Sequence, residues 1–323
     1  MKTFLLTRRA ALSGAALLAS PAVHAQTRRP IRLIVPFSAG GNTDAVARLV
    51  SPRVSEMLGV PIAVENRPSA STIVGVEAVV RAQPDGTTIL ICDTTLAVLP
   101  TLHPTLPFDI FRDLMPVGAI AAAPTTLVVR RELPARNLQE FIALARAQPG
   151  QISYATGSIG GTAHLAALLL QESAQIRLNF IPYAGAGQAA NDLVAGHLDV
   201  NFSALNAVLG LMQAGNIRAL ATSAAERQSL APEVPTFREQ GLPDVVVSAH
   251  WGLYAPNGTP APAIQTLSDA FRRAANEDPV RAELVRRGYG LVNADPAEHT
   301  RILREEFEKW GGVMRRAGAV PAR

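Results

Sequence analysis

The chain has 323 residues, 48% of them apolar, which is ample material for a buried core, and the length suits two lobes. Its 30 Lys and Arg stand against 26 Asp and Glu, and three of the basic residues belong to an N-terminal leader, so the rest carries a net charge of about +1. With 5% aromatic residues as well, this near-neutral body excludes a nucleic-acid surface of clustered cations and stacking rings.

Residues 1–25 have the pattern of a cleaved export signal. Lys2, Arg8 and Arg9 form a basic start, Ala10–Ala19 is a short apolar stretch, and small residues up to Ala25 suit cleavage after it. The paired arginines leave open whether the general secretory or the twin-arginine route is used. No later apolar run reaches the roughly 18 residues of a membrane span, so we expect a soluble, periplasmic mature protein.

A short strand and a glycine turn open the mature sequence. Ile31–Val35 is an apolar, branched run typical of a buried strand, and Pro36 ends it because proline has no N–H to donate. Gly40 and Gly41 close the turn that follows. Glycine can adopt positive φ and bring bare backbone close to a ligand.

A helix is predicted directly after this turn. Asn42 or Thr43 is the expected N-cap, Asp44 lies in the first turn, and Gly59 ends the helix. Unpaired N–H groups and the positive end of the helix dipole would point at one place, which suits an anion. An ordinary strand-to-helix loop is the alternative interpretation.

The same sequence of strand, glycine turn and helix is predicted again about 120 residues later. A strand containing Ile152 and Tyr154 leads into Gly160 and Gly161, and Thr162 is the predicted N-cap of a second helix. Two such turns in an exported, two-lobe chain predict a cleft with one helix N-terminus from each lobe facing it. Such fixed dipoles can hold a carboxylate without a cationic side chain.

Strands and helices alternate along the remainder, which predicts an α/β fold with parallel, doubly wound sheets. Cys92 ends one strand and is predicted to be a buried, inert thiol, since its single sulfur has no partner for a disulfide. Further strands are predicted at Ile62–Glu65, Thr87–Cys92, Val117–Ala122, Thr126–Val129, Leu178–Pro182, Asp199–Phe202, Ile217–Thr222 and Val245–Ser248, and helices at 72–83, Leu138–Ala147, Thr162–Glu172, Gln188–Ala195, Ala263–Asn276 and from Pro296.

Nine short motifs in fixed order resemble the Bug family, the extracytoplasmic substrate-binding receptors of tripartite tricarboxylate transporters. The resemblance runs from about Ile31 to the C-terminus. Its motifs are PF-SAGG-N-TD, VENRP, PDG, LPFD, YATGS with GGTAH, PYAG, AGHLDV, RALA and GTPAP.

The resemblance implies a two-lobed periplasmic binding protein, type 2-like, with a doubly wound sheet in each lobe and a central cleft. Two hinge crossings are expected, near Ala123–Thr126 and near Ser248–Trp251. The implied division is a signal peptide over 1–25, lobe 1 over 26–124 and 249–323, and lobe 2 over 125–248. We expect a monomer that delivers its ligand to the membrane permease subunits of such a transporter.

The resemblance also implies which residues bind the ligand, a small di- or tricarboxylate, amino acid or aromatic acid. The two glycine turns would pinch one carboxylate through backbone N–H groups, and side chains of lobe 2 would select the rest of the ligand. The implied residues are Phe37, Ser38, Ala39, Gly40, Gly41, Asn42, Thr43 and Asp44 in the first turn, Thr156, Gly157, Ser158, Gly160, Gly161, Thr162 and His164 in the second, and Tyr183 and Ser203.

Two departures from the family pattern affect the ligand. Residues 69–72 replace a glycine-rich run, and Ser203-Ala204 stand where relatives often carry an acidic residue. An acid lost from the pocket changes which polar group the pocket favours. The sequence therefore predicts the fold more firmly than the ligand.

Other chemistries have weaker support. Ser158 with His164 is the pair for an exported serine hydrolase, the alternative to a receptor, but Gly157–Gly160 misses the G-x-S-x-G elbow by one position. The dinucleotide-like run at 185–190 lacks the acidic residue about 20 positions on. The mature histidines have no metal-ligand spacing. We therefore expect no enzymatic activity, no cofactor and no metal.

Overall fold

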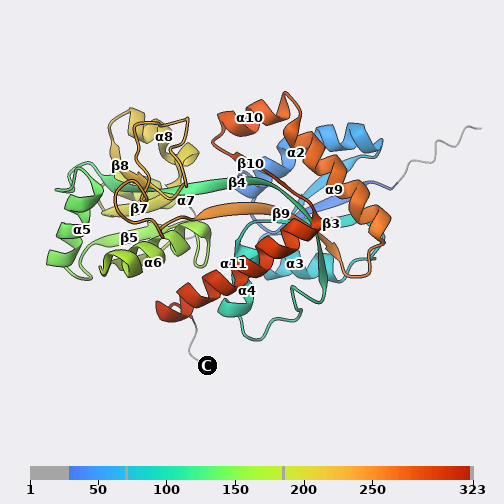
Figure 1. The fold of residues 1–323 in the computed structure, drawn as a ribbon, viewed down its shortest axis with the longest axis horizontal. Helices are drawn as coiled ribbons and strands as arrows, with labels where there is room; N and C mark the ends of the chain where they lie inside the picture. The colour runs from blue at the N-terminus through green and yellow to red at the C-terminus, as the bar shows by residue number, and fades with distance from the viewer. Residues whose placement is uncertain (1–28, 70–71, 184–185, 321–323) are drawn as a thin grey trace, which may run out of the picture.

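A computed structural model describes residues 29–69, 72–183 and 186–320 of this chain (Figure 1). The predicted signal peptide lies outside the described residues. Two α/β lobes lie side by side, joined by long strands that run from one to the other. The two-lobed α/β architecture predicted from the sequence is confirmed.

The strands of the described residues form one continuous sheet in the order β2-β1-β3-β9-β4-β7-β5-β6, with β10 and β8 also paired to β4. The strands are β1 (Ile31–Val35), β2 (Ile62–Asn66), β3 (Thr88–Cys92), β4 (Leu114–Arg130), β5 (Ser153–Thr156), β6 (Asn179–Pro182), β7 (Val200–Ala204), β8 (Ile217–Thr222), β9 (Ser248–Pro256) and β10 (Gly290–Ala294). Strands β2-β1-β3 and β7-β5-β6 are parallel, whereas β4 and β9 run antiparallel to their neighbours, so each half is mixed rather than purely parallel.

Helices cover both faces of each half of the sheet. They are α2 (Asn42–Leu58), α3 (Ile73–Val80), α4 (Thr95–Leu102), α5 (Leu138–Ala147), α6 (Thr162–Ala174), α7 (Ala186–Val194), α8 (Leu205–Gln213), α9 (Ala261–Asn276), α10 (Val280–Arg286) and α11 (Pro296–Arg316). Helices α2, α9 and α10 bury one side of the first half and α3, α4 and α11 the other, while α5 and α6 lie opposite α7 and α8 on the second half. Each half of the sheet is therefore doubly wound.

Strand β4 belongs to both halves and changes its partners midway. It pairs with β9 as far as Pro124 opposite Ser248, and with β7 from Thr125 opposite Ala204. The two extended segments predicted at Val117–Ala122 and Thr126–Val129 are thus one strand. The predicted strand at Val245–Ser248 is wrong, because the extended segment begins only at Ser248 and continues as β9.

Helix α11 begins as predicted, with Pro296 in its first turn and the Asp295 side chain accepting a hydrogen bond from the Glu298 N–H at 2.9 Å. Its C-terminal half leaves the first lobe and packs against α6 (Figure 1). Trp310, Val313 and Met314 share a buried cluster with α6 residues. The two lobes are therefore linked by a packed helix as well as by the strands.

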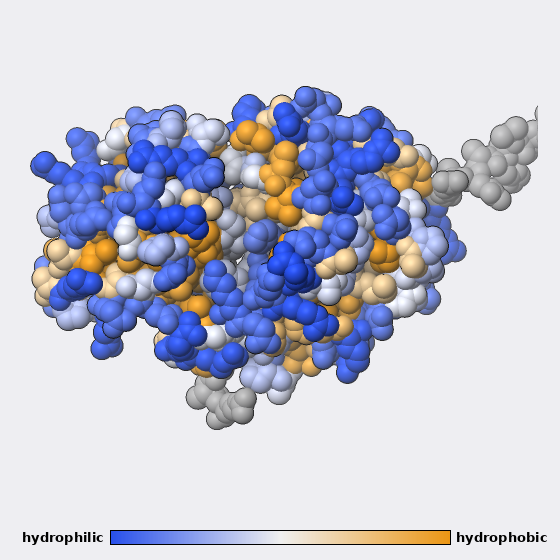
Figure 2. All heavy atoms as spheres, in the orientation of Figure 1, coloured by the Kyte–Doolittle hydropathy of each residue, from blue (hydrophilic) through white to orange (hydrophobic). Residues whose placement is uncertain are grey.

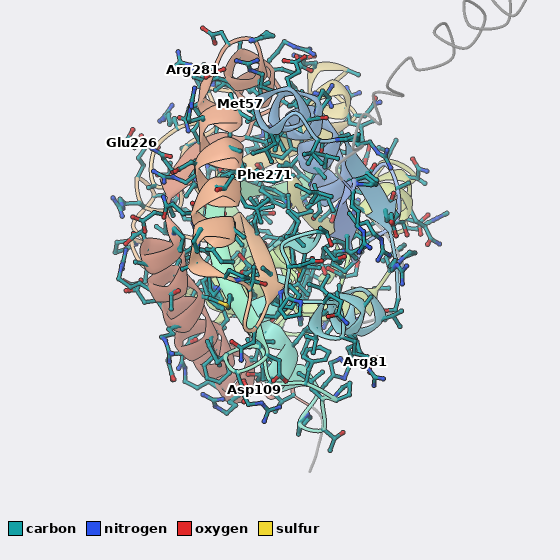
Figure 3. All side chains as sticks on the ribbon, turned by 90° about the vertical axis from the view of Figure 1, so that its right-hand side faces the viewer. Met57, Arg81, Asp109, Glu226, Phe271 and Arg281 are labelled. Atoms are coloured by element: carbon teal, nitrogen blue, oxygen red, sulfur yellow. The ribbon has the colours of Figure 1, made fainter. Side chains whose placement is uncertain are left out.

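Apolar side chains form the interior of the protein, and most of its visible surface is hydrophilic (Figure 2). Hydrophilic residues cover most of the face seen in Figure 2, with apolar side chains visible near the junction of the two halves. In Figure 3, Phe271 lies in the interior against the sheet, while Arg81, Asp109, Glu226 and Arg281 lie at the periphery.

Cys92 is fully buried, as expected, and burial raises the pKa of its thiol. No helix in the described parts of the chain is long and apolar enough to cross a membrane.

We predict that Gly75→Ala destabilises the protein by roughly 1–3 kcal/mol, because a methyl group there overpacks the contact between α3 and the end of β1. A Cβ at Gly75 would lie 2.6 Å from the Pro36 Cβ. Gly210→Ala, in α8, is the matched control, because its Cβ would meet no atom within 4 Å. Alanine is about 1 kcal/mol more favourable than glycine inside a helix, so this variant should be at least as stable as wild type. Urea unfolding of both variants measures the difference. Equal stabilities would contradict this close packing.

Candidate ligand-binding cleft

Two equivalent glycine turns start α2 and α6. Gly40 and Gly160 have positive φ values of 83° and 74°, a conformation that favours glycine. Gly41 and Gly161 follow in extended conformation and occupy the N-cap positions. The predicted caps Asn42, Thr43 and Thr162 are therefore wrong, because each helix already includes these residues and begins directly after its glycine pair.

The third residue of each helix holds its turn in place. The Gly40 N–H donates to Asp44 Oδ2 at 2.9 Å, and the Gly160 N–H donates to His164 Nδ1 at 3.0 Å. The first glycine amide of each pair is thus used within the turn. Backbone N–H groups of the first helical turn, which have no partner inside a helix, are left to face the space beyond.

Asp44 stays ionised through its own contacts. Arg48 Nε and Asn66 Nδ2 each donate to its carboxylate at 2.9 Å, in addition to the Gly40 N–H. Burial acts to raise the pKa of this carboxyl, but the hydrogen bonds from Arg48, Gly40 and Asn66 outweigh it, so the pKa lies below its ordinary value of 3.8.

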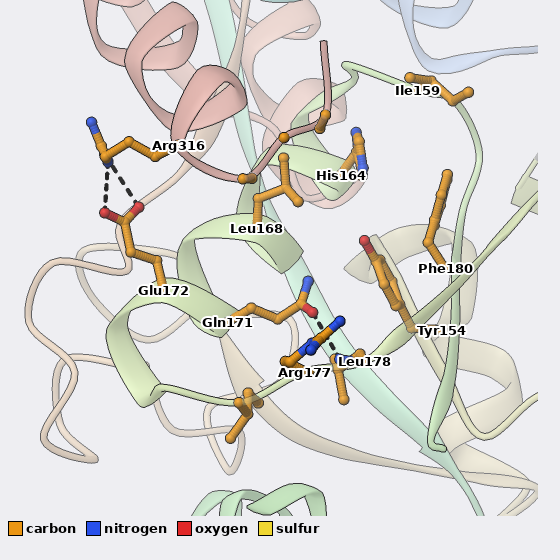
Figure 4. Close-up of a pocket in the computed structure, with 14 residues that line it drawn as sticks. Tyr154, Ile159, His164, Leu168, Gln171, Glu172, Arg177, Leu178, Phe180 and Arg316 are labelled. Atoms are coloured by element: carbon orange, nitrogen blue, oxygen red, sulfur yellow. Dashed lines mark hydrogen bonds and ion pairs between the residues drawn. The ribbon is translucent and has the colours of Figure 1, made fainter. Parts of the chain in front are cut away.

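His164 has the same role in the second turn as Asp44 has in the first, but it accepts the glycine N–H as a neutral ring. Burial lowers its pKa to about 4, and because Nδ1 accepts the Gly160 N–H, the ring proton is on Nε2. The ring stacks on Phe180, with 4.8 Å between ring centroids. It lines a lateral cavity of about 760 Å³ with Tyr154 and Phe180, on the flank of α6 (Figure 4).

A second cavity, of about 160 Å³, lies between the lobes where α2 and α6 begin. We call it the cleft cavity. Its lining comes from both halves of the chain: Asn42, Asp93, Ala123, Pro124, Thr125, Ala249 and Trp251, together with Gly157, Ser158, Gly161, Thr162, Ala163, Ala186, Phe202, Ser203, Ala204 and Ala207. The two helix starts therefore face one shared cavity.

The walls of the cleft cavity offer uncharged donors and one acid. The hydroxyls of Thr125 and Thr162 are buried and have no hydrogen-bond partner among the described residues. The lining residues of that part of the chain include no Lys, Arg or His, and Asp93 is their one ionisable side chain. Buried polar atoms are normally paired, so the two free hydroxyls indicate a place for a polar ligand or water.

Lobe-1 side chains fix the start of α2 against this cavity. Trp251 Nε1 donates to Thr43 Oγ1 at 2.9 Å, and the Tyr289 hydroxyl donates to Asn42 Oδ1 at 3.1 Å. The Trp251 and Tyr289 rings also contact each other edge to face, 5.2 Å apart. Strand β9 and the residue before β10 therefore hold the first turn of α2 in place.

The cavity brings together six of the residues implied by the family resemblance: Asn42, Gly157, Ser158, Gly161, Thr162 and Ser203. A second group shapes or supports the turns from outside the lining, namely Phe37, Ser38, Ala39, Gly40, Gly41, Thr43, Asp44, Thr156, Gly160 and His164. Tyr183 also lies outside the lining, and its hydroxyl donates to Asp192 Oδ2 at 2.6 Å.

Sequence reasoning did not select Asp93, Thr125, Phe202 or Tyr289. Asp93 directly follows the buried strand β3, and the carboxyl ends of strands are where α/β folds place ligand-binding residues, so this position was an available signal. The sequence around Tyr289 does not indicate a role in the site, because Tyr289 contacts Asn42 only in the folded protein.

The geometry defines a class of protein: a two-lobed α/β binding protein with a small cavity between its lobes. The sequence model of the tripartite tricarboxylate transporter family receptor matches residues 46–319, and the chain belongs to this family of receptors. The protein BugT of Bordetella pertussis is 33% identical over 90% of this chain and 90% of its own length.

Solved structures agree with this assignment. MatC (Rpa3494) from Rhodopseudomonas palustris, with bound malate, is 31% identical and has a TM-score of 0.79 over 88% of this chain and 99% of its own. Rpa4515 of R. palustris, with adipate, is 29% identical and has a TM-score of 0.83 over 91% of this chain and 98% of its own. Both neighbours hold a dicarboxylate.

We predict that Asp44→Asn costs about 1.5 kcal/mol of stability at pH 7, from the weakened charge-assisted hydrogen bonds, and that the cost disappears in acid. The folded-state pKa is depressed, so the carboxylate stabilises the protein above its ordinary pKa of 3.8, and this contribution is lost as the pH falls through the folded value. Thermal unfolding at pH 7 and below pH 3 measures the loss. Asp269→Asn, at an exposed position on α9, is the control expected to change little at either pH. A difference that does not shrink in acid would contradict the role given to Asp44.

Proposed function

We propose that the cleft cavity captures a small carboxylate at the start of α2 and α6, and that the chain serves as the exported receptor that delivers this ligand to a tripartite transporter permease. The observation that carries this proposal is the convergence of two uncapped helix starts on one cavity that holds unpartnered hydroxyls and, among its described residues, no cationic side chain. The malate and adipate of the two neighbours each offer a carboxylate, the group that two helix starts favour.

The energy available from neutral groups is sufficient. A hydrogen bond to a charged group contributes about 1.5–3 kcal/mol, and a helix terminus in favourable geometry up to about 2 kcal/mol. A micromolar complex needs about 8 kcal/mol, which a few such groups supply. The hydroxyls of Ser158, Thr125 and Thr162 are the side-chain donors, with backbone N–H groups from both helices.

Lobe closure around the ligand is part of the proposal. We assign residues 26–124 and 249–323 to lobe 1 and 125–248 to lobe 2, with hinges near Ala123–Thr126 and Ser248–Trp251. The change of β4 partners between Pro124 and Thr125 supports the first hinge, and the start of β9 at Ser248 lies at the second. The packing of the end of α11 on α6 means that closure must carry this helix end with lobe 2.

We predict that Gly161→Ala lowers affinity for a bound carboxylate severalfold but by less than about tenfold, as the loss of one hydroxyl donor would. A Cβ at Gly161 would lie only 2.3 Å from Ser158 Oγ, so the hydroxyl must move within the cavity. Malate, adipate and related acids in a thermal-shift panel would first identify a ligand, since a ligand at about 100 times its Kd adds about 2.7 kcal/mol of stability. Titration calorimetry would then compare Gly161→Ala with wild type. Unchanged affinity would contradict capture at this helix start.

The serine-hydrolase alternative is tested by Ser158→Ala. Ser158 lines the cleft cavity, whereas His164 lines the lateral cavity and uses Nδ1 for the Gly160 N–H, so the pair is poorly arranged for nucleophile and base. We predict that Ser158→Ala weakens carboxylate binding by less than about tenfold, from loss of one hydroxyl donor. Hydrolysis of a p-nitrophenyl ester by wild type that vanishes in Ser158→Ala would favour the hydrolase.

A further inference from the structure

Asp93 is an unexpected feature of a cavity that faces two helix N-termini. It directly follows β3 and lines the cleft cavity beside Trp251 and Asn42. Ser203 and Ala204, at the end of β7, line the same cavity without a charge. The fold supplies an acid to the same cavity from a different strand end.

Among the described residues, no hydrogen bond or ion pair joins Asp93 to a Lys or Arg side chain. Its Oδ1 accepts the Thr95 N–H at 3.0 Å, which anchors the side chain at the start of α4. The neighbouring acid, Glu306, is turned to other partners, because its Oε1 accepts from Thr94 Oγ1 at 3.0 Å and lies 2.6 Å from His250 Nδ1. Burial raises the pKa of Asp93, and the charge of Glu306 acts in the same direction.

This arrangement places potentials of both signs in one small space. The starts of α2 and α6 favour a negative group, while the carboxylate of Asp93 favours a positive one. The volume of the cavity, about 160 Å³, suits a short molecule. A ligand with one charge of each sign would satisfy both ends, whereas a second carboxylate beside Asp93 would add like-charge repulsion.

We propose that Asp93 makes the cleft selective for a short carboxylate that also carries a cationic group, such as a protonated amine, with the carboxylate at the helix starts and the cation at Asp93. This rests on the proposed carboxylate capture and narrows it to one ligand class. Asp93 then acts as the residue that separates zwitterionic ligands from simple acids of the same size.

The experiment compares matched pairs that differ by one amine: butyrate with 4-aminobutyrate, succinate with L-aspartate, and glutarate with L-glutamate. Calorimetric titration of the mature wild-type chain should show at least one amine-bearing acid binding about tenfold or more tighter than its partner. Asp93→Asn should remove this preference by weakening the amine-bearing acid at least tenfold while changing the simple acid less than threefold or strengthening it. Asparagine can still accept the Thr95 N–H, so the start of α4 is preserved, which thermal unfolding checks.

Ser203→Ala is the matched control, because it removes an uncharged group from the same cavity. It should weaken both members of a pair alike and leave their ratio unchanged. Wild type that binds the simple acids as tightly as the amine-bearing acids, or an Asp93→Asn variant that keeps the preference, would overturn the role of Asp93 and leave carboxylate capture intact. Wild type that binds neither member of any pair would overturn both proposals.

Discussion

Two backbone hydrogen bonds set the geometry on which the cleft depends. In each lobe a glycine at positive φ gives its N–H to the third residue of the helix that follows, Asp44 in one case and His164 in the other. The bond closes the turn and aims the start of the helix at the space between the lobes. An ionised carboxylate and a neutral imidazole serve equally, because each presents one unprotonated acceptor at the same place.

The rest of the fold brings these two helix starts together. Strand β4 is shared by both lobes, β9 runs beside it, and the end of α11 packs on α6, so the lobes are placed relative to each other by three segments far apart in sequence. Trp251 and Tyr289 then brace α2 from behind. In the proposed lobe closure, the hinges lie on strands that continue from one lobe to the other, so that the lobes rotate while each helix start keeps its orientation.

The described lining of the cleft presents helix dipoles and hydroxyls to a ligand, and no cationic side chain. Backbone N–H groups and hydroxyls are preorganised and carry no net charge, so they avoid the desolvation penalty of a buried Lys or Arg. In our proposal the single acid at Asp93 decides which ligands fit, because no Lys or Arg lines the described part of the cavity to offset it. Affinity and selectivity are thus assigned to different groups.

Local sequence determined much of this protein. Branched apolar runs predicted β1 and β3, glycine pairs predicted both turns, Asp295 with Pro296 predicted the start of α11, and the ordered motifs indicated the receptor family. These features depend on backbone conformation and burial of neighbouring residues, which a short stretch of sequence encodes.

Only the tertiary structure decided how these parts meet. It joined two predicted strands into β4, assigned the N-caps to Gly41 and Gly161, turned His164 away from the cleft cavity and brought Asp93 into it. Each outcome depends on contacts between residues remote in sequence, and the packing that selects among locally acceptable conformations exists only once the chain has folded.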